Sequence, residues 1–558
     1  TEHRAMKTSR SFLVAILLCI ATTASIAQGW QWSQHFGGPG HDWGYIGAVD
    51  TLGNIYCYGT YAGPGPDNYF NLYIEGDTLE GNKDSFIAKF DPNGALVWVK
   101  NCVSSTDYLG ISSLCMDPQS DLLYVTGTCV NSGNLGSCPL DSTGGWIAQF
   151  DLDGNCNWAK TFSNGAFGTG IVSDGSGMVY LSGLTSGPGP IIVDGILVPS
   201  GTFFAAYNEE GDIQWAKELV TGLSINGNGR YYPYQLKYHN GSILVHGAAF
   251  QYSNSGPWQV DTVVANVVEG GGHVLMNLDA SNGVARWVKP LGFSWTTQNT
   301  VLRRKMDVGV DGSIYCISTA GGDSARFGGD TAVVVPPNGS VTCLVRYDQQ
   351  GEMVHFRTYN TEVGLQSIKV ANDGTLLIDL YWFEGGSFDE CSGPQGNYLV
   401  RTDSIGNCLA MLELGNTYGG MSLEETENAI YICSASQQFG SSNYGGEIYT
   451  TYGFEDVLLA KHDLALGVSS MQGQGNEQLV IYANPNQGTF RVKVPDAFLN
   501  RSGLQLKVID SAGRIVHDQT LNLQGESPRM DLFDVSPGYY LVTLGNSERT
   551  YSGHMVVE

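Results

Sequence analysis

The sequence predicts an all-β protein, a seven-bladed β-propeller followed by a small all-β module. Glycine supplies 74 of the 558 residues and charged residues only 15%, which favours short strands and tight turns over helices. One pattern recurs along most of the chain without gaps. The final part carries strand patterns with different turn residues. These three observations define one large repeat domain and one small domain.

The recurring pattern is a β-hairpin. In its first copy, "DSFIAKFDPNGALVWVK", Phe86, Ala88 and Phe90 alternate with other residues, as in a strand. "DPNG" then supplies a turn, and a second strand carries Trp98 and Lys100. The further copies are Gly144 to Lys160, Gly201 to Lys217, His273 to Lys289, Val341 to Arg357, Gly396 to Leu412 and the shortened Asp456 to Asp463.

A second hairpin precedes each of these copies. Its first example is "VDTLGNIYCYGTY", from Val49 to Tyr61. Two hairpins make four antiparallel strands per repeat. The repeats are 55 to 72 residues long, measured between Trp98 and its equivalents at 158, 215, 287, 355 and 410. This length suits propeller blades better than solenoid turns.

The two ends of the repeat array predict ring closure. The seventh copy lacks its last strand, and "GWQWSQHFGG", from Gly29 to Gly38, supplies such a strand without a partner hairpin. An N-terminal strand that completes the last blade removes the open sheet edges and gives seven blades. We expect the repeated tryptophans to pack between neighbouring blades; they are Trp32, Trp98, Trp158, Trp215 and Trp287.

The repeats resemble the secreted bacterial β-propeller repeats that carry "GN-x-Y-x-x-G" and "D-x-F-[IV]-A-K". Gly53 to Gly59 and Asp84 to Trp98 match these motifs. The resemblance extends from Gly29 to about Asp463 and fades where His355 and Ala410 replace Trp. It implies the fold and very little about activity.

The first residues predict export. Met6 is followed by Lys7, Arg10, the apolar run from Phe12 to Ile20 and a small residue at Ala27, as in a secretory signal peptide. That run is too short to span a bilayer, and we expect no transmembrane segment. The predicted parts are 1–27, upstream residues and signal peptide; 28–464, the propeller; 465–478, a linker; and 479–558, the small domain.

The small domain resembles the C-terminal sorting domain of the Bacteroidetes type IX secretion system. The motif residues are Asn484, Pro485, Gly488, Asp510, Gly513, Arg514, Gly538 and Tyr540. The resemblance implies a β-sandwich that interacts with the type IX secretion machinery and with a sortase. It also implies that the protein is secreted or held at the outer cell surface.

Cysteine usage leaves the disulfides open. The chain has twelve Cys, and removal of Cys19 with the signal leaves eleven, so at least one thiol stays unpaired or pairs with another chain. Spacing makes Cys129 and Cys138 the best single disulfide candidate. Cys156 and Cys408, each in "GNC", are expected to be small buried strand residues.

Charge and motifs exclude several classes of function. The net charge of −26 repels phosphate backbones, so nucleic acid is not an expected partner. The sequence has no H-E-x-x-H, paired C-x-x-C, G-x-S-x-G or phosphate-binding motif. Asp91 and Asp151 begin turns like those of a calcium loop but lack its Glu at position 12, so we expect turn-forming acids. We assign no catalytic residue, cofactor or metal.

Two regions are candidates for ligand binding. "YYPYQLKYHNG", from Tyr231 to Gly241, fits either a glycan platform or, preferably, strand packing. The long segments between the two hairpins of each repeat are expected to emerge on one face, where binding surfaces usually lie. We therefore expect a binding, adhesion or scaffold module for an unknown glycan or protein. The alternative is a polysaccharide-active hydrolase or lyase with carboxylates from different blades.

Overall fold

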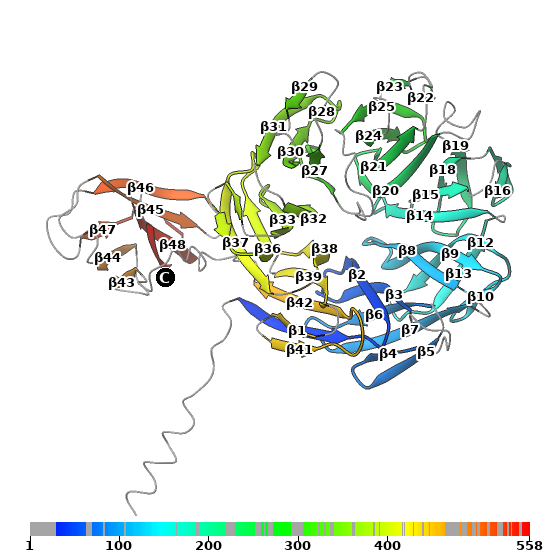
Figure 1. Ribbon diagram of the computed structural model, residues 1–558, viewed down its shortest axis with the longest axis horizontal. Coiled ribbons are helices and arrows are strands. Elements are labelled where there is room, and N and C mark those ends of the chain that lie inside the picture. Colours follow the sequence, from blue (N-terminus) through cyan, green and yellow to red (C-terminus); the bar gives the residue numbers. More distant parts are fainter. Residues whose placement is uncertain are drawn as a thin grey trace, which may run out of the picture.

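The computed structural model describes residues 29–557 with gaps, the longest of which are 63–69, 219–228, 292–304 and 464–478. The secondary-structure elements of this described part are all β-strands (Figure 1). The predicted signal peptide and linker lie outside the described residues.

Seven antiparallel sheets, each with four repeat strands, follow one another along the described part of the chain, and we number them sheets 1 to 7. Sheet 1 contains β2 (His41–Val49), β3 (Ile55–Ala62), β6 (Asp84–Phe90) and β7 (Leu96–Ser104). Sheet 2 contains β8 (Tyr108–Asp117), β9 (Leu122–Val130), β12 (Gly144–Asp151) and β13 (Cys156–Thr161). Sheet 3 contains β14 (Ala166–Ser173), β15 (Val179–Thr185), β18 (Thr202–Tyr207) and β19 (Ile213–Glu218).

The remaining sheets have the same strand order. Sheet 4 contains β20 (Gly229–His239), β21 (Ser242–Gln251), β24 (Gly272–Asp279) and β25 (Ala285–Pro290). Sheet 5 contains β26 (Met306–Val308), β27 (Ile314–Gly321), β30 (Ser340–Tyr347) and β31 (Met353–Tyr359). Sheet 6 contains β32 (Val363–Val370), β33 (Leu376–Trp382), β36 (Gly396–Thr402) and β37 (Cys408–Gly415). Sheet 7 contains β38 (Gly419–Glu425), β39 (Ala429–Ala435), β42 (Val457–Asp463) and, from the N-terminal end, β1 (Trp30–Phe36).

The N-terminal strand β1 lies antiparallel to β42, with Ser33 paired with Ala460 and Phe36 with Val457. The sequence predicts this pairing from the strand that the seventh copy lacks. Strand β42 therefore has a partner on both sides, β1 and β39. The pairing joins segments more than 400 residues apart in sequence.

The hydrophobic core is divided among the junctions between consecutive sheets. One buried cluster joins Tyr58 of sheet 1 to Leu114 of sheet 2, and another joins Tyr180 of sheet 3 to Leu236 of sheet 4. A further cluster joins Leu459 of sheet 7 to Cys57 of sheet 1. The sheets are arranged about a common axis, with the first strand of each nearest the middle (Figure 1). This arrangement is propeller-like.

A repeated hydrogen bond joins the outer strand of one sheet to the turn of the next. The indole Nε1 of Trp32 donates to the carbonyl oxygen of Pro92 at 3.0 Å, and that of Trp98 to Leu152 at 3.1 Å. The other three are Trp158 to Glu209, Trp215 to Ala280 and Trp287 to Gln349. Each predicted packing tryptophan therefore bridges two sheets, although none is completely buried.

Short hairpins fill the segments between the second and third strands of the sheets. They are β4 (Phe70–Ile74) with β5 (Asp77–Gly81), β10 (Gly133–Leu135) with β11 (Cys138–Leu140), β16 (Ile191–Val193) with β17 (Ile196–Val198), β22 (Trp258–Val260) with β23 (Val263–Ala265), β28 (Ser324–Phe327) with β29 (Thr331–Val334), β34 (Gly386–Phe388) with β35 (Cys391–Gly393), and β40 (Ser441–Tyr444) with β41 (Glu447–Thr450). They lie toward the outside of the array (Figure 1). Strand β10 also pairs with β7 of the preceding sheet. The described parts of these variable segments thus form short strand pairs, as the sequence predicts for many of them.

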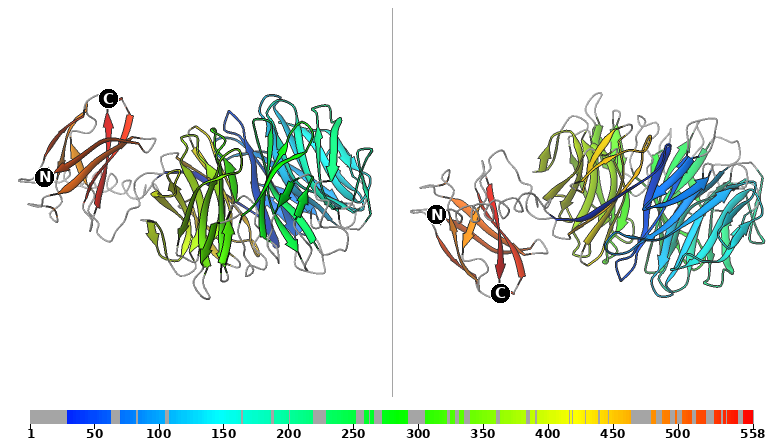
Figure 2. Two further views of the ribbon diagram at one scale, coloured as in Figure 1. Left: turned by 90° about the horizontal axis from the view of Figure 1, so that it is seen from above. Right: turned by 90° about the horizontal axis from the view of Figure 1, so that it is seen from below.

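The C-terminal part forms a separate β-sandwich with its own core (Figure 2). One sheet has the order β43 (Val480–Tyr482), β44 (Thr489–Lys493) and β47 (Arg529–Asp531). The other has the order β46 (Ile515–Leu521), β45 (Leu504–Asp510), β48 (Gly538–Gly545) and β49 (Thr550–Val557). Phe490, Val508 and Val542 are buried between the two sheets.

We predict that Gly351→Ala destabilises the protein more than Gly374→Ala. Both glycines have left-handed backbone, with φ of 74° and 80°, so Ala costs about 1 kcal/mol at either position. A Cβ at Gly351 would also lie 2.7 Å from the Trp287 ring, whereas nothing lies within 4 Å at Gly374. Displacing the indole adds about 1–3 kcal/mol. Thermal and urea unfolding of the two variants measure the difference, and equal losses would mean that the indole contact does not stabilise the junction.

Candidate functional site

The repeated acids shape turns. The Asp91 carboxylate accepts hydrogen bonds from the backbone N–H of Asn93 at 2.8 Å and of Ala95 at 2.9 Å. Asp151 makes the same two bonds, to Asp153 and Asn155. An aspartate at the start of a turn stabilises it in this way. No group of three or more His, Cys, Asp or Glu side chains suited to a metal ion occurs in the part of the chain that the structure describes.

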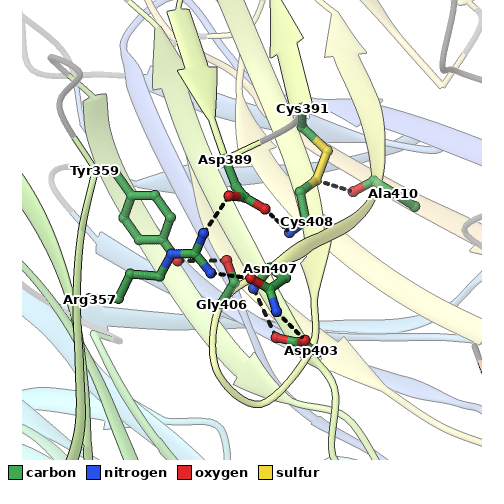
Figure 3. Close-up of a disulfide and its surroundings, with 9 residues drawn as sticks. All are labelled: Arg357, Tyr359, Asp389, Cys391, Asp403, Gly406, Asn407, Cys408 and Ala410. Carbon is green, nitrogen blue, oxygen red and sulfur yellow. Dashed lines mark hydrogen bonds and ion pairs between the residues drawn. A yellow bond between two sulfur atoms is a disulfide. The ribbon is translucent and has the colours of Figure 1, made fainter. Parts of the chain in front are cut away.

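Acids at the turns of the short hairpins between the second and third strands hold neighbouring sheets together. Asp389 forms an ion pair with Arg357 of sheet 5 and accepts a hydrogen bond from the backbone N–H of Cys408 of sheet 6 at 3.0 Å (Figure 3). Beside it, the Tyr359 hydroxyl donates to the Gly406 carbonyl oxygen at 2.8 Å. This carboxylate therefore bridges two outer strands.

The same bridge recurs elsewhere on the rim. Asp261 pairs with Lys217 of sheet 3 at 2.5 Å and accepts from the Ala285 N–H of sheet 4 at 2.8 Å. Asp194 pairs with Lys160 at 2.7 Å. All three acids have positive φ, a conformation that Asp tolerates better than most residues. The Lys of the "W-x-K" repeat motif thus has a structural contact in these two sheets.

The disulfides differ from the sequence-based expectation. Cys138 pairs with Cys156, and Cys391 with Cys408. The predicted Cys129–Cys138 bond is wrong because Cys129 is buried in β9, between sheets 1 and 2, as a free thiol. Cys156 and Cys408 are also more than small buried residues, since each ties an outer strand to the hairpin beside it (Figure 3).

The first strands of sheets 4 to 7 carry alternating charges at one register position. The residues are Lys237, Asp307, Lys369 and Glu424, which pair across strands with Leu244, Tyr315, Leu377 and Tyr431. Asp307 bonds to the Lys237 ammonium at 2.7 Å and accepts from the Val370 N–H at 2.8 Å. Lys369 and Glu424 lie 2.6 Å apart. We call this row the charge ladder.

The charge ladder is internally neutralised. Burial lowers the pKa of the Lys369 ammonium, but the carboxylates of Glu424 and Asp307 outweigh burial and hold it above its usual value. Sheets 1 to 3 carry Ala48, Cys115 and Val172 at the equivalent position. Ion pairs therefore join sheet 4 to sheet 5 and sheet 6 to sheet 7, and the Val370 hydrogen bond to Asp307 joins sheet 5 to sheet 6. The ladder offers no unpaired charge of its own.

A second polar cluster, the seam cluster, lies where sheet 7 meets sheet 1. It consists of His35, His41, Asp42, Glu455 and Asp456. His35 contacts Asp456 at 2.7 Å, and His41 contacts Glu455. Burial, with the nearby charges of Asp456 and Glu455, raises the pKa of Asp42 well above its usual value, although the Gly38 N–H opposes this. Asp42, Glu455 and Asp456 are each at most 3% exposed. The buried cluster therefore holds the connection between β1 and β2 in place.

Asp379 is a buried carboxyl group in the second strand of sheet 6. Neither of its oxygens, nor the hydroxyl of the cross-strand residue Ser367, has a hydrogen-bond partner among the described residues. Burial raises the pKa of Asp379 to about 8. Asp379 therefore carries a proton at neutral pH.

The predicted sorting motif is partly described. Asp510 accepts hydrogen bonds from the backbone N–H of Arg514 at 2.9 Å and from its guanidinium at 2.8 Å. Gly488 has φ of 85°, and the Tyr540 hydroxyl donates to the Ser536 carbonyl oxygen at 2.6 Å. Gly538 begins β48. Three motif residues lie outside the described residues: Asn484, Pro485 and Gly513.

Comparison with known proteins identifies this C-terminal part. Residues 480–558 match the secretion system C-terminal sorting domain. The protein is therefore exported by type IX secretion to the cell surface or the extracellular space. No helix in the described residues is long and apolar enough to cross a membrane. No curated protein matches the sequence significantly.

Solved structures resemble the chain at low identity. A protein of unknown function from Bacteroides caccae is 14% identical, with 59% of this chain and 89% of that chain covered and a TM-score of 0.29. A member of the DUF4221 family from Bacteroides vulgatus is 11% identical, with 63% and 93% covered and a TM-score of 0.26. A Synechocystis apocarotenoid oxygenase is 12% identical, with 70% and 90% covered and a TM-score of 0.31.

We predict that Asp379→Asn flattens the pH dependence of stability. The folded pKa of about 8 lies above the ordinary value of 3.8, so the stabilisation is complete below about pH 4 and is lost as the pH rises from there through 8. The neutral amide removes this loss. The variant should therefore gain at least about 1 kcal/mol relative to wild type between pH 5 and pH 8. Thermal unfolding at several pH values measures this gain, and parallel profiles would show that Asp379 does not titrate as described.

Proposed function

We propose that this chain is a closed seven-bladed β-propeller that works outside the cell as a binding, adhesion or scaffold module. The seven buried clusters between consecutive sheets and the β1–β42 pairing support closure. The sorting domain supports the location. A closed propeller presents a rigid surface on which side chains can be fixed for recognition.

The binding proposal rests mainly on the structural contacts of the carboxylates. The carboxylates of the turns, the rim, the charge ladder and the seam cluster are engaged in contacts that hold strands or sheets together. Acid–base catalysis needs such groups within reach of a substrate. The carboxylates of the charge ladder and the seam cluster are held in contacts between strands and sheets. A binding module, by contrast, requires only that the array of sheets be rigid.

A polysaccharide-active hydrolase or lyase is the second candidate. Asp42, with a raised pKa, lies beside two further carboxylates, and a glycosidase needs one protonated and one ionised carboxyl group. However, Asp42 is 2% exposed and Asp456 is completely buried. A sugar could reach them only after rearrangement of the seam, which favours the binding proposal.

We predict retention without turnover. The full purified chain is applied to an array of glycans and extracellular matrix proteins, and the solution is examined for cleavage products by chromatography. The proposal expects at least one retained ligand and an unchanged product profile. Release of shortened or unsaturated sugars would overturn it in favour of the enzyme, and retention of nothing would leave only a structural surface component.

A further inference from the structure

One level on the first strands of sheets 1, 3 and 4 carries an aromatic residue. Trp43, Phe167 and Tyr232 pair with Thr60, Leu184 and Ala248 of the second strands. Those partners pair in turn with Ser85, Thr202 and His273, which occupy one position of the repeat. Because the register is the same in each sheet, the three aromatic residues lie at the same height along the axis.

Sheet 2 supplies a ring at this level in another way. Gly110 occupies the position, paired with Thr128, and the Tyr108 side chain lies over it. A Cβ on Gly110 would be only 2.0 Å from the Tyr108 hydroxyl oxygen. Four consecutive sheets therefore present aromatic rings, and we call these residues the aromatic belt: Trp43, Tyr108, Phe167 and Tyr232.

On the opposite side of the array, the described residues at this level are glycines. Sheet 6 has Gly364, paired with Tyr381, and sheet 7 has Gly419, paired with Ala435. The corresponding residue of sheet 5 is not among the described residues. Rings on one side and glycines on the other make the inner wall asymmetric, although the repeat itself would make it uniform.

Packing accounts for only part of the aromatic belt. Trp43 is 43% exposed and Tyr108 is 38% exposed, and Phe167 and Tyr232 are partly exposed. By contrast, Tyr231, beside Tyr232, is buried in the cluster between sheets 3 and 4. Thus the "YYPYQLKYHNG" segment contributes Tyr231 and Tyr238 to packing, and Tyr232 as a partly exposed ring. Exposed rings gathered on the innermost strands indicate a binding surface.

We propose that the aromatic belt binds an uncharged sugar ring of a glycan. This inference rests on the proposed binding function and gives it a site. An indole or phenol face stacks on the apolar face of a sugar, while the ring edge and hydroxyl supply hydrogen bonds. The glycines opposite present no side chain that would occupy the same level. The net charge of −26 disfavours acidic polysaccharides, so the ligand is neutral.

The test is isothermal titration of the full chain with cellohexaose, mannohexaose and, as an anionic probe, hexagalacturonate. We expect binding of a neutral hexasaccharide and no binding of hexagalacturonate. Trp43→Ala and Tyr108→Ala should each weaken binding about tenfold or more. Trp43→Phe should lose less, because it retains a ring. Thermal unfolding close to that of wild type confirms that each variant is folded.

Tyr452→Ala is the matched control. Tyr452 is 54% exposed, but it lies at the seam beside His35, with ring centroids 5.0 Å apart, and not on an innermost strand. Its loss should leave sugar affinity unchanged. Unchanged affinity in both Trp43→Ala and Tyr108→Ala, or preference for hexagalacturonate, would overturn the sugar site while the binding function stands. Cleavage of a hexasaccharide would instead overturn the proposed binding function.

Discussion

The contact between the outer strand of one sheet and the turn of the next is the interaction on which the rest of the structure depends. Each four-stranded sheet buries its faces only against its neighbours, so an isolated repeat would leave apolar surface in water. The tryptophan N–H donates to a carbonyl oxygen in the next turn, and its ring covers the glycine there, as Trp32 covers Gly94. A residue larger than glycine at that turn would displace the ring.

Sheets that lack this tryptophan contact use other links. His355 replaces Trp in sheet 5 and still contacts the Ile405 carbonyl oxygen at 3.0 Å, and Arg357 adds the Asp389 bridge nearby. Sheet 6 has Ala410 on its last strand, and the ladder pair of Lys369 and Glu424 joins the first strands of sheets 6 and 7. The rim bridges, the disulfides and the ladder thus reinforce an array whose repeats have diverged.

Much of the fold could be predicted because the repeat has a local sequence pattern with a direct structural meaning. Turn acids, turn glycines and the tryptophan position recur at fixed spacing. The "GWQWSQHFGG" strand, which has no partner hairpin in the sequence, predicted the β1–β42 pairing. The disulfides were missed because Cys138 and Cys391 lie in hairpins whose docking the sequence spacing does not reveal. The charge ladder could have been found from the sequence, because its four residues all precede equivalent turns of the repeat: Lys237, Asp307, Lys369 and Glu424. The aromatic belt needed the structure, because the exposed fractions of Trp43 and Tyr108 and the position of the Tyr108 ring beside Gly110 do not follow from the sequence.

Hydrogen exchange across the junction of the two chain ends tests the central claim most directly. The claim is that strand β1 is an integral strand of sheet 7 and closes the array. Backbone amides of Trp30–Phe36 should then be as protected as those of Val457–Asp463, because both strands share one ladder of hydrogen bonds. Rapid exchange of Trp30–Phe36 beside protected Val457–Asp463 would contradict the account, since sheet 7 would then end in an open edge and the array would not be a closed ring.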